Sequence, residues 1–369
     1  MSSICTPGGG LGKTGSLLRR GGRVSVAYLG GSITQAGKSR KRPFHGWRGY
    51  TTEWLQSAYP GANIVEVNAG IGGTSSALGV FRAKSDVLAF SPDLIFVEFV
   101  VNDEECDEHT SISSMEGIVR QALQHENRPQ LCFVYTVNEP YILFYKAGKL
   151  PDRLVWHEKV ARRYAIPSIN IGRPIAEKII AGRLEWRSFA PDGTHPSPEG
   201  FALYRDLVIE QLRTLLQMPQ VNSPSAPPSQ LSNLDLAGAD IAYVKESDAQ
   251  ADWIWTGEKL TKGWARFGNV LAAEYPAHPL RLNFSGRSVG LYYVVGPESG
   301  DIECAIDGGD FKKYRIFDRH SQKFYRPYYQ VLTHDLAEGS HTIDIRMCEQ
   351  KPPNSRGRKF WLGGLLVRR

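Results

Sequence analysis

The sequence predicts an α/β domain followed by an all-β domain, and three observations support this. Over residues 24–216, short apolar runs alternate with longer amphipathic or polar stretches. Residues 219–232 are rich in proline and serine, a composition typical of a linker. Beyond them, short runs of β-forming residues are separated by turn residues. We therefore place the first domain at 1–218 and the second at 233–369, with 219–232 as the linker.

Five apolar runs of the first domain are predicted strands. They are dominated by Val, Ile, Leu and Phe without strict alternation, as expected for strands covered on both faces. The runs are Val24–Leu29, Ile64–Val67, Leu94–Val101, Leu131–Val137 and Ser168–Ile171. Helices are predicted at Tyr50–Ala58, Ile112–Gln124 and Asp152–Tyr164, and from Pro198 onward. This alternation indicates a doubly wound parallel sheet of about five strands with helices on both faces.

The second domain has a different pattern. Its β-forming runs recur at about ten-residue spacing, with turn residues such as Asp307-Gly308-Gly309 between them. The runs are Leu280–Phe284, Ser288–Val295, Ile302–Ile306, Tyr314–Phe317, Gln330–Asp335, His341–Met347 and Lys359–Val367. Several short strands without a helix predict an antiparallel β-sandwich.

Composition excludes several classes of protein. With 41% hydrophobic and 22% charged residues, the 369-residue chain has the composition of a globular protein. No run approaches the roughly 18 apolar residues of a membrane span, and the net charge of +6 is modest, so we expect neither a membrane nor a nucleic-acid partner. Five cysteines without a Cys-x-x-Cys motif, and no apolar leader, favour a reducing, cytoplasmic location. Secretion is the alternative if a leader has been removed. Composition does not predict the oligomeric state.

Two polar motifs lie where predicted strands end. Residues 30–34 (Gly-Gly-Ser-Ile-Thr) follow the first apolar run, and Asn102 ends the third. Ligand sites of open α/β sheets lie at such strand ends. Ser32 is a candidate nucleophile, because the flanking glycines let the backbone approach a substrate. Asn102 can donate to an oxyanion. A turn that only caps the next segment is the alternative for each motif.

Residues 192–196 (Asp-Gly-Thr-His-Pro) are a candidate acid–base motif. Their spacing can hold the Asp192 carboxylate against one imidazole nitrogen of His195 while the other nitrogen faces a nucleophile. The alternative is a solvated turn before a helix, since Asp-Gly is common turn material. Together with the glycine-rich residues 68–74, the motifs supply the groups that acyl transfer needs.

In this order, the four motifs resemble those of the SGNH (GDSL-like) hydrolases, over roughly residues 22–216. The resemblance implies a flavodoxin-like sheet and a serine ester hydrolase that needs no cofactor and no metal. The implied site residues are the nucleophile Ser32, the base His195, its orienting acid Asp192, and the oxyanion-hole donors Ser32, Gly73 and Asn102.

The sequence departs from the family pattern at two positions. Gly31 stands where the family usually has Asp before the serine, and Val100 stands where it usually has Gly before the asparagine. The first departure is expected to change the hydrogen bonding of the serine loop. The second is expected to narrow the space beside the oxyanion hole. Neither removes a catalytic group.

The sequence of the second domain gives an indication of the substrate class. The segments 290–293, 306–309 and 339–343 resemble β-jelly-roll modules attached to carbohydrate acetyl esterases. In the family-two esterases that module precedes the hydrolase domain, whereas here it follows. The resemblance therefore implies removal of acetyl groups from O-acetylated sugars or oligosaccharides through an acyl-enzyme intermediate. The alternatives are a lipid or thioester acyl hydrolase using the same site, and a carbohydrate-binding protein with a vestigial hydrolase domain. The alternative for the β-sandwich is that it serves only as a structural appendage or as a dimerisation surface.

Three further sets of residues carry possible functional signals. His45, Trp47 and Arg48 follow the serine motif and are predicted to line the substrate site. Residues 7–14 resemble a phosphate-binding loop but lack its first glycine and the preceding strand. The acidic residues 104–109 are expected to form a solvated loop at the rim of the cleft rather than a metal site.

Overall fold

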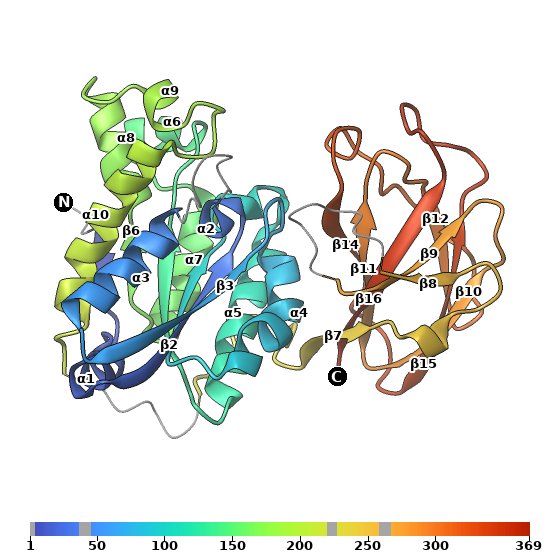
Figure 1. Cartoon of the computed structure of the whole chain (residues 1–369), viewed down its shortest axis with the longest axis horizontal. Helices are drawn as coiled ribbons and strands as arrows, with labels where there is room; N and C mark the ends of the chain where they lie inside the picture. The colour runs from blue at the N-terminus through green and yellow to red at the C-terminus, as the bar shows by residue number, and fades with distance from the viewer. Residues whose placement is uncertain (1–3, 37–45, 220–226, 258–266) are drawn as a thin grey trace. The chain divides into compact units, whose positions relative to one another are not determined.

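The chain divides into two compact units, Met1–Ala237 and Gly238–Arg369 (Figure 1). The computed structural model describes residues 4–36, 46–219, 227–257 and 267–369. The sequence placed the linker at 219–232, but residues 227–237 belong to the first unit. The Glu116 side chain accepts hydrogen bonds there from the N–H groups of Leu231 (2.8 Å) and Ser232 (2.9 Å).

A six-stranded sheet lies at the centre of the first unit, in the order β1-β6-β5-β4-β2-β3. Its strands are β1 (Cys5–Thr6), β2 (Gly22–Gly30), β3 (Ala62–Gly70), β4 (Leu94–Glu98), β5 (Gln130–Tyr135) and β6 (Ser168–Asn170). Strands β2 to β6 are parallel, and β1 adds an antiparallel edge. The order of the five parallel strands is that of the flavodoxin-like fold, so the predicted fold class is confirmed.

Two helical layers flank this sheet (Figure 1). Helix α3 packs against α10, whereas α4 packs against α5 and α5 against α7. The helices are α1 (Gly12–Arg20), α2 (Ser32–Gln35), α3 (Gly46–Ala58), α4 (Ser76–Asp86), α5 (Glu108–Gln124), α6 (Tyr141–Lys146), α7 (Asp152–Arg163), α8 (Gly172–Ile180), α9 (Trp186–Phe189) and α10 (Pro198–Leu215). Short 3₁₀ turns are η1 (Leu88–Phe90), η2 (Asn102–Glu105) and η3 (Glu246–Asp248), the last in the second unit.

Local capping explains where two of these helices begin. Ser197 precedes α10 and accepts a hydrogen bond from the Gly200 N–H (3.1 Å), with Pro198 in the first turn. Asp107 precedes α5 and accepts one from the Thr110 N–H (2.7 Å). Helix α4 was not predicted, because Ser76–Ala83 are all buried and the segment therefore lacks an amphipathic pattern.

The second unit is built from two antiparallel sheets. One has the order β10-β15-β12-β13, and the other has the order β14-β11-β16-β9-β8, with β7 also paired to β16. The strands are β7 (Ala239–Tyr243), β8 (Ile254–Thr256), β9 (Val270–Glu274), β10 (Leu280–Ser285), β11 (Ser288–Val295), β12 (Ile302–Ile306), β13 (Lys312–Tyr314), β14 (Arg326–Thr333), β15 (Ser340–Met347) and β16 (Lys359–Arg368). Side chains of both sheets share one core, including Leu291 of β11 and Ile345 of β15, so this unit is the predicted sandwich.

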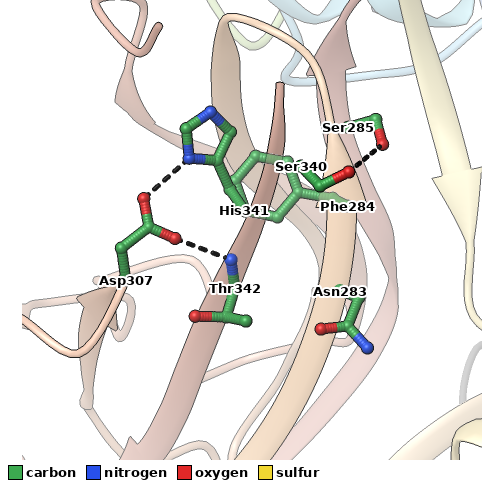
Figure 2. A pocket seen from close by; sticks show the side chains of 7 residues that line it. All are labelled: Asn283, Phe284, Ser285, Asp307, Ser340, His341 and Thr342. Carbon is green, nitrogen blue, oxygen red and sulfur yellow. Dashed lines mark hydrogen bonds and ion pairs between the residues drawn. The ribbon is translucent and has the colours of Figure 1, made fainter. Parts of the chain in front are cut away.

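A cavity of about 380 Å³ lies on the second unit beside β10 and β15. Figure 2 shows the Asp307 carboxylate directed at His341 and Thr342. Asp307 accepts from His341 Nδ1 and from the Thr342 N–H, while His341 Nε2 bonds to the Ala337 carbonyl (2.9 Å). The hydrogen bond to Asp307 raises the pKa of His341. These polar groups therefore satisfy one another's hydrogen bonds and fix the turns next to β12 and β15.

Candidate active site

Ser32 lies where the strand order reverses. Strand β2 pairs with β3 on one side and with β4 on the other, and Ser32 begins α2 just beyond the end of β2. Such switch points are the usual ligand sites of doubly wound sheets. The Ser32 hydroxyl lies 2.7 Å from His195 Nε2. This is the contact that a serine nucleophile needs with its general base.

The loop between α9 and α10 supplies the base and its partner. Asp192 Oδ2 lies 2.6 Å from His195 Nδ1, while Asp192 Oδ1 accepts from the N–H groups of Thr194 (2.9 Å) and His195 (2.7 Å). Burial alone would raise the pKa of Asp192, but the hydrogen bonds from His195 and Thr194 outweigh it and lower that pKa. One oxygen of the carboxylate thus shapes the loop and the other orients the imidazole, which leaves Nε2 to accept the Ser32 proton.

Asn102 lies against the turn that carries Ser32. It is the first residue of η2, and its side chain packs on Gly31, where a Cβ would stand 1.8 Å from Asn102 Oδ1. Among the described residues, Asn102 Oδ1 is buried without a hydrogen-bond partner. Within the described part of the chain, Nδ2 has none either, so the amide N–H₂ remains available to a ligand. The departure at Gly31 thus has a physical reason: this placement of Asn102 leaves no room for a side chain.

The loop after β3 is tied to the same turn. The Gly72 N–H donates to Gln35 Oε1 (2.9 Å), and Asn68 Nδ2 donates to the Gln35 carbonyl (3.4 Å). Gly73 has φ +70°, a left-handed conformation that favours glycine. Its N–H bonds to no other described residue. The N–H of Ser32 also has no acceptor inside α2, because Ser32 is the first residue of that helix.

Comparison with known proteins finds a family match within the first unit. Residues 28–203, which contain Ser32, Gly73, Asn102 and His195, match the model of the GDSL-like Lipase/Acylhydrolase family. This segment is a GDSL-like acylhydrolase domain. The family that the sequence motifs resemble is thereby confirmed for the segment.

Two solved structures share the fold of both units. A two-domain esterase (CEX) active on acetylated mannans is 23% identical, with a TM-score of 0.82 over 99% of this chain and 98% of that chain. The structure of a two-domain esterase (CEX) co-crystallized with mannopentaose is 24% identical, with a TM-score of 0.80 over 95% and 92%. At these identities the similarity shows the fold, including a second domain after the GDSL-like domain. No curated protein sequence matches the chain.

Two of the predicted lining residues lie in the core of the GDSL-like domain. Trp47 is completely buried and packs edge-on against Tyr28 and Phe96. Arg48 is also buried, forms an ion pair with Glu66, and donates from Nε to the Thr34 carbonyl (3.2 Å). Burial lowers the pKa of Arg48. Trp47 is therefore a core residue, Arg48 is tied to the serine turn through Thr34, and neither side chain is exposed to a substrate.

The reason for this difference is the start of α3. The sequence predicted a helix from Tyr50, but α3 begins at Gly46, and its first turn is buried. The third predicted lining residue, His45, lies outside the described residues.

The other two motifs have structural roles. Lys13 Nζ donates to the carbonyls of Asn127 (2.9 Å) and Arg128 (3.0 Å), so it braces a turn after α5. In the acidic stretch, Glu108 forms an ion pair with Lys159, and His109 bonds to Asn233 (2.8 Å). Across the described ranges, no cluster of three or more His, Cys, Asp or Glu could hold a metal ion. No described helix is both long and apolar enough to span a bilayer.

Sequence reasoning missed two buried charged residues beneath the serine turn. Arg82 of α4 donates to the carbonyls of Gly30 (3.0 Å) and Ala69, and so ties the ends of β2 and β3 together. Glu98 ends β4 with no exposed surface, and its oxygens accept from the hydroxyls of Thr34 and Thr136, both at 2.8 Å. A glutamate inside the apolar run 94–101 was the available signal for Glu98. Arg82 lies on a helix that was not predicted.

Burial raises the pKa of Glu98 from 4.5 to about 7, so its titration should appear in the stability of the domain. The folded chain holds the Glu98 proton more tightly than the unfolded chain does. The contribution of Glu98 to the free energy of unfolding is therefore fully present below a pH of about 4.5, and it is lost as the pH rises to about 7. The shift corresponds to about 3 kcal/mol. Glu98→Gln cannot titrate, so its stability relative to the wild type should increase across this window in urea unfolding.

A control for this prediction is Thr136→Val, which removes one donor to the carboxylate. Without this donor the pKa of Glu98 should rise further, and the loss of stability should extend to higher pH. Parallel stability curves for the wild type and Glu98→Gln across the window would contradict the assignment.

The contact between Gly31 and Asn102 predicts the effect of a single added methyl group. In Gly31→Ala the new Cβ would overlap the Asn102 amide and displace it. We expect kcat for ester hydrolysis to fall toward the roughly 10²-fold loss typical of a missing oxyanion donor, with a smaller change in KM. Gly61→Ala is the control, because a Cβ there would meet only the Gly21 Cα at 4.0 Å. Undiminished kcat in Gly31→Ala would mean that the Asn102 amide is not needed in its present position.

Proposed function

We propose that this chain is a carbohydrate O-acetylesterase, a serine ester hydrolase that removes acetyl groups from O-acetylated sugars or oligosaccharides. The observation that carries the proposal is the continuous hydrogen-bonded series from Ser32 through His195 to Asp192, at 2.7 and 2.6 Å. Beside it lies the Asn102 amide, which packs on the serine turn and has no hydrogen-bond partner among the described residues. A nucleophile, an oriented base and an unoccupied donor are the requirements of acyl transfer.

In the proposed first step, Ser32 Oγ attacks the acetyl carbon and its proton passes to His195 Nε2. The carbonyl oxygen becomes an oxyanion, which accepts hydrogen bonds from the N–H groups of Ser32 and Gly73 and from the Asn102 amide. The C–O bond to the sugar then breaks, and His195 gives its proton to the leaving sugar oxygen. The products of this step are a free sugar hydroxyl and an acetyl group esterified to Ser32.

In the second step, a water molecule attacks the acetyl carbon and its proton passes to His195. The same three donors hold the second oxyanion. The bond between the carbon and Ser32 Oγ breaks, the serine recovers its proton from His195, and acetic acid leaves as acetate. Asp192 stays ionised and keeps the imidazole oriented in both steps.

Two observations favour a carbohydrate ester over a long acyl chain. The side chains of His195 and Asp192 are 46% and 58% exposed, so the reacting groups are open to solvent and can reach a bulky polar substrate. The second observation is the shared architecture with the esterase active on acetylated mannans, over nearly the whole of both chains.

The test is acetate release from a panel of esters. The panel contains acetylated manno-oligosaccharides, acetylated xylo-oligosaccharides, a long-chain acyl ester and an acyl thioester, with Ser32→Ala as the blank. We expect acetate release from at least one acetylated oligosaccharide, at a higher kcat/KM than for the long-chain ester or the thioester. A preference for the long-chain ester or the thioester would assign the same site to lipid or thioester hydrolysis. Binding of the oligosaccharides without hydrolysis would contradict an enzymatic function.

A further inference from the structure

Asp103, the residue directly after Asn102, lies at the centre of a buried polar cluster. It has no exposed surface, and its carboxylate accepts four hydrogen bonds. The donors are the N–H (2.8 Å) and hydroxyl (2.7 Å) of Ser76, the hydroxyl of Ser111 (2.8 Å) and Nε2 of His157 (2.8 Å). Hydrogen bonds to a carboxylate are stronger than those between neutral groups. These four hydrogen bonds therefore hold the Asp103 side chain in a fixed position.

The donors come from three helices of one layer. Ser76 is the first residue of α4, Ser111 lies in α5 and His157 lies in α7. His157 is almost fully buried, and its Nδ1 has no hydrogen-bond partner in the part of the chain that the structure describes. Because a carboxylate only accepts, Nε2 is the protonated nitrogen, and it donates a hydrogen bond to Asp103. Asp103 fastens the start of η2 to all three helices at once.

The hydrogen bonds of Asp103 connect the segments that carry two of the proposed oxyanion donors, Asn102 and Gly73. The side chain of Asn102 makes no hydrogen bond of its own to the described residues, so its direction depends on the backbone of η2 and on its packing against Gly31. On the other side, Ser76 directly follows the loop 71–75, which contains Gly73. The bond from the Ser76 N–H to Asp103 therefore links the Gly73 loop to the Asn102 turn.

We propose that Asp103 is a positioning residue that fixes the spacing of Asn102 and Gly73 around the oxyanion. This inference rests on the proposed function of the site. Asp103 touches neither the substrate nor Ser32 in this scheme; it acts through the two donors. A carboxylate with a purely structural role would affect the stability of the domain and leave the oxyanion donors in place.

The test is a double-mutant cycle between Asp103→Asn and Asn102→Ala, measured with one soluble acetyl ester. Asn keeps the shape of Asp, but its amide group cannot accept all four donors. We expect Asp103→Asn to lower kcat by about 10-fold, with KM changed less than about 2-fold, because the donors it orients act in the transition state. In the Asn102→Ala background the same substitution should lower kcat only about 2-fold, through the remaining Gly73 donor.

Glu158→Gln is the matched control. Glu158 lies next to His157 on α7, is largely buried, and accepts from the hydroxyls of Tyr135 (2.9 Å) and Ser168 (2.8 Å). It is bonded to β5 and β6, away from the oxyanion donors, so its substitution should lower stability and leave kcat unchanged. If Asp103→Asn fails to fold, Ser111→Ala removes one of the four donors and should show the same coupling at a smaller size.

The outcomes separate the two proposals. If the wild type hydrolyses no ester and Ser32 does not react with a fluorophosphonate, the proposed function fails. If the wild type is active but Asp103→Asn costs the same factor in kcat in both backgrounds, Asp103 is a structural residue and this inference is overturned. Unchanged kcat in the folded Asp103→Asn protein would overturn it as well.

Discussion

Replacing Ser32 with alanine is expected to lower kcat for acetyl ester hydrolysis by about 10³-fold or more. In the proposed mechanism the Ser32 hydroxyl bonds to the acyl carbon, and it lies 2.7 Å from His195 Nε2, the nitrogen proposed to take its proton. The residual rate should come from substrate binding and the oxyanion donors alone. Acetate release under saturating substrate measures the effect, and thermal unfolding of the mutant should match that of the wild type, because Ser32 is only half-buried.

A second substitution shows whether Ser32 and His195 act as one unit. Each single alanine mutant should lose nearly all activity, and the Ser32→Ala/His195→Ala double mutant should be little worse than either. Losses that multiply in the double mutant would indicate independent roles. Turnover like that of the wild type in Ser32→Ala would rule out Ser32 as the nucleophile.

Replacing Asn102 with alanine is expected to lower kcat by about 10²–10³-fold, with a smaller change in KM. The amide would donate to a charge that exists only in the transition state, so its loss should leave substrate binding largely intact. The truncation also leaves none of the described groups without its partner, because Asn102 Oδ1 has no hydrogen-bond partner among them. Steady-state kinetics with one acetylated oligosaccharide separate the effects on kcat and KM.

Asn102→Asp sharpens this experiment. It keeps the shape of the side chain but places a carboxylate where a donor is needed, so it should be at least as damaging as Asn102→Ala. An increase in KM with an unchanged kcat in Asn102→Ala would make Asn102 a residue that binds the ground state of the substrate.

The residues predicted from sequence are those whose signal is local. Ser32 and Asn102 follow apolar runs, and Asp192 and His195 share a short motif, so their types and spacing are visible in the chain. A parallel sheet brings strand ends to one edge, which explains why Ser32 and Asn102 lie together. Asp192 and His195 come from the loop between α9 and α10, and the contact of His195 with Ser32 completes the group. Strands β11 and β12 have the predicted bounds for a similar reason, since turn residues mark both of their ends.

The residues that were missed depend on partners far away in the sequence. Asp103 receives its donors from three helices, and one of them, α4, has no amphipathic pattern to reveal it. Trp47 and Arg48 follow the serine motif closely in sequence, but an earlier start of α3 places them in the core. Whether such a residue faces a ligand or the core is decided by packing, which local sequence does not specify.

Titration of the active protein with a fluorophosphonate is the most direct test of the proposed mechanism. The reagent phosphonylates a serine whose base and oxyanion donors are in place. Peptide mass mapping locates the label, and acetate release from an acetylated oligosaccharide is followed in the same samples. We expect the label on Ser32 and a loss of acetate release in proportion to labelling, with no label in Ser32→Ala. Acetate release that persists in fully labelled protein, or a label on another residue that abolishes activity, would contradict the assignment of Ser32 as the nucleophile.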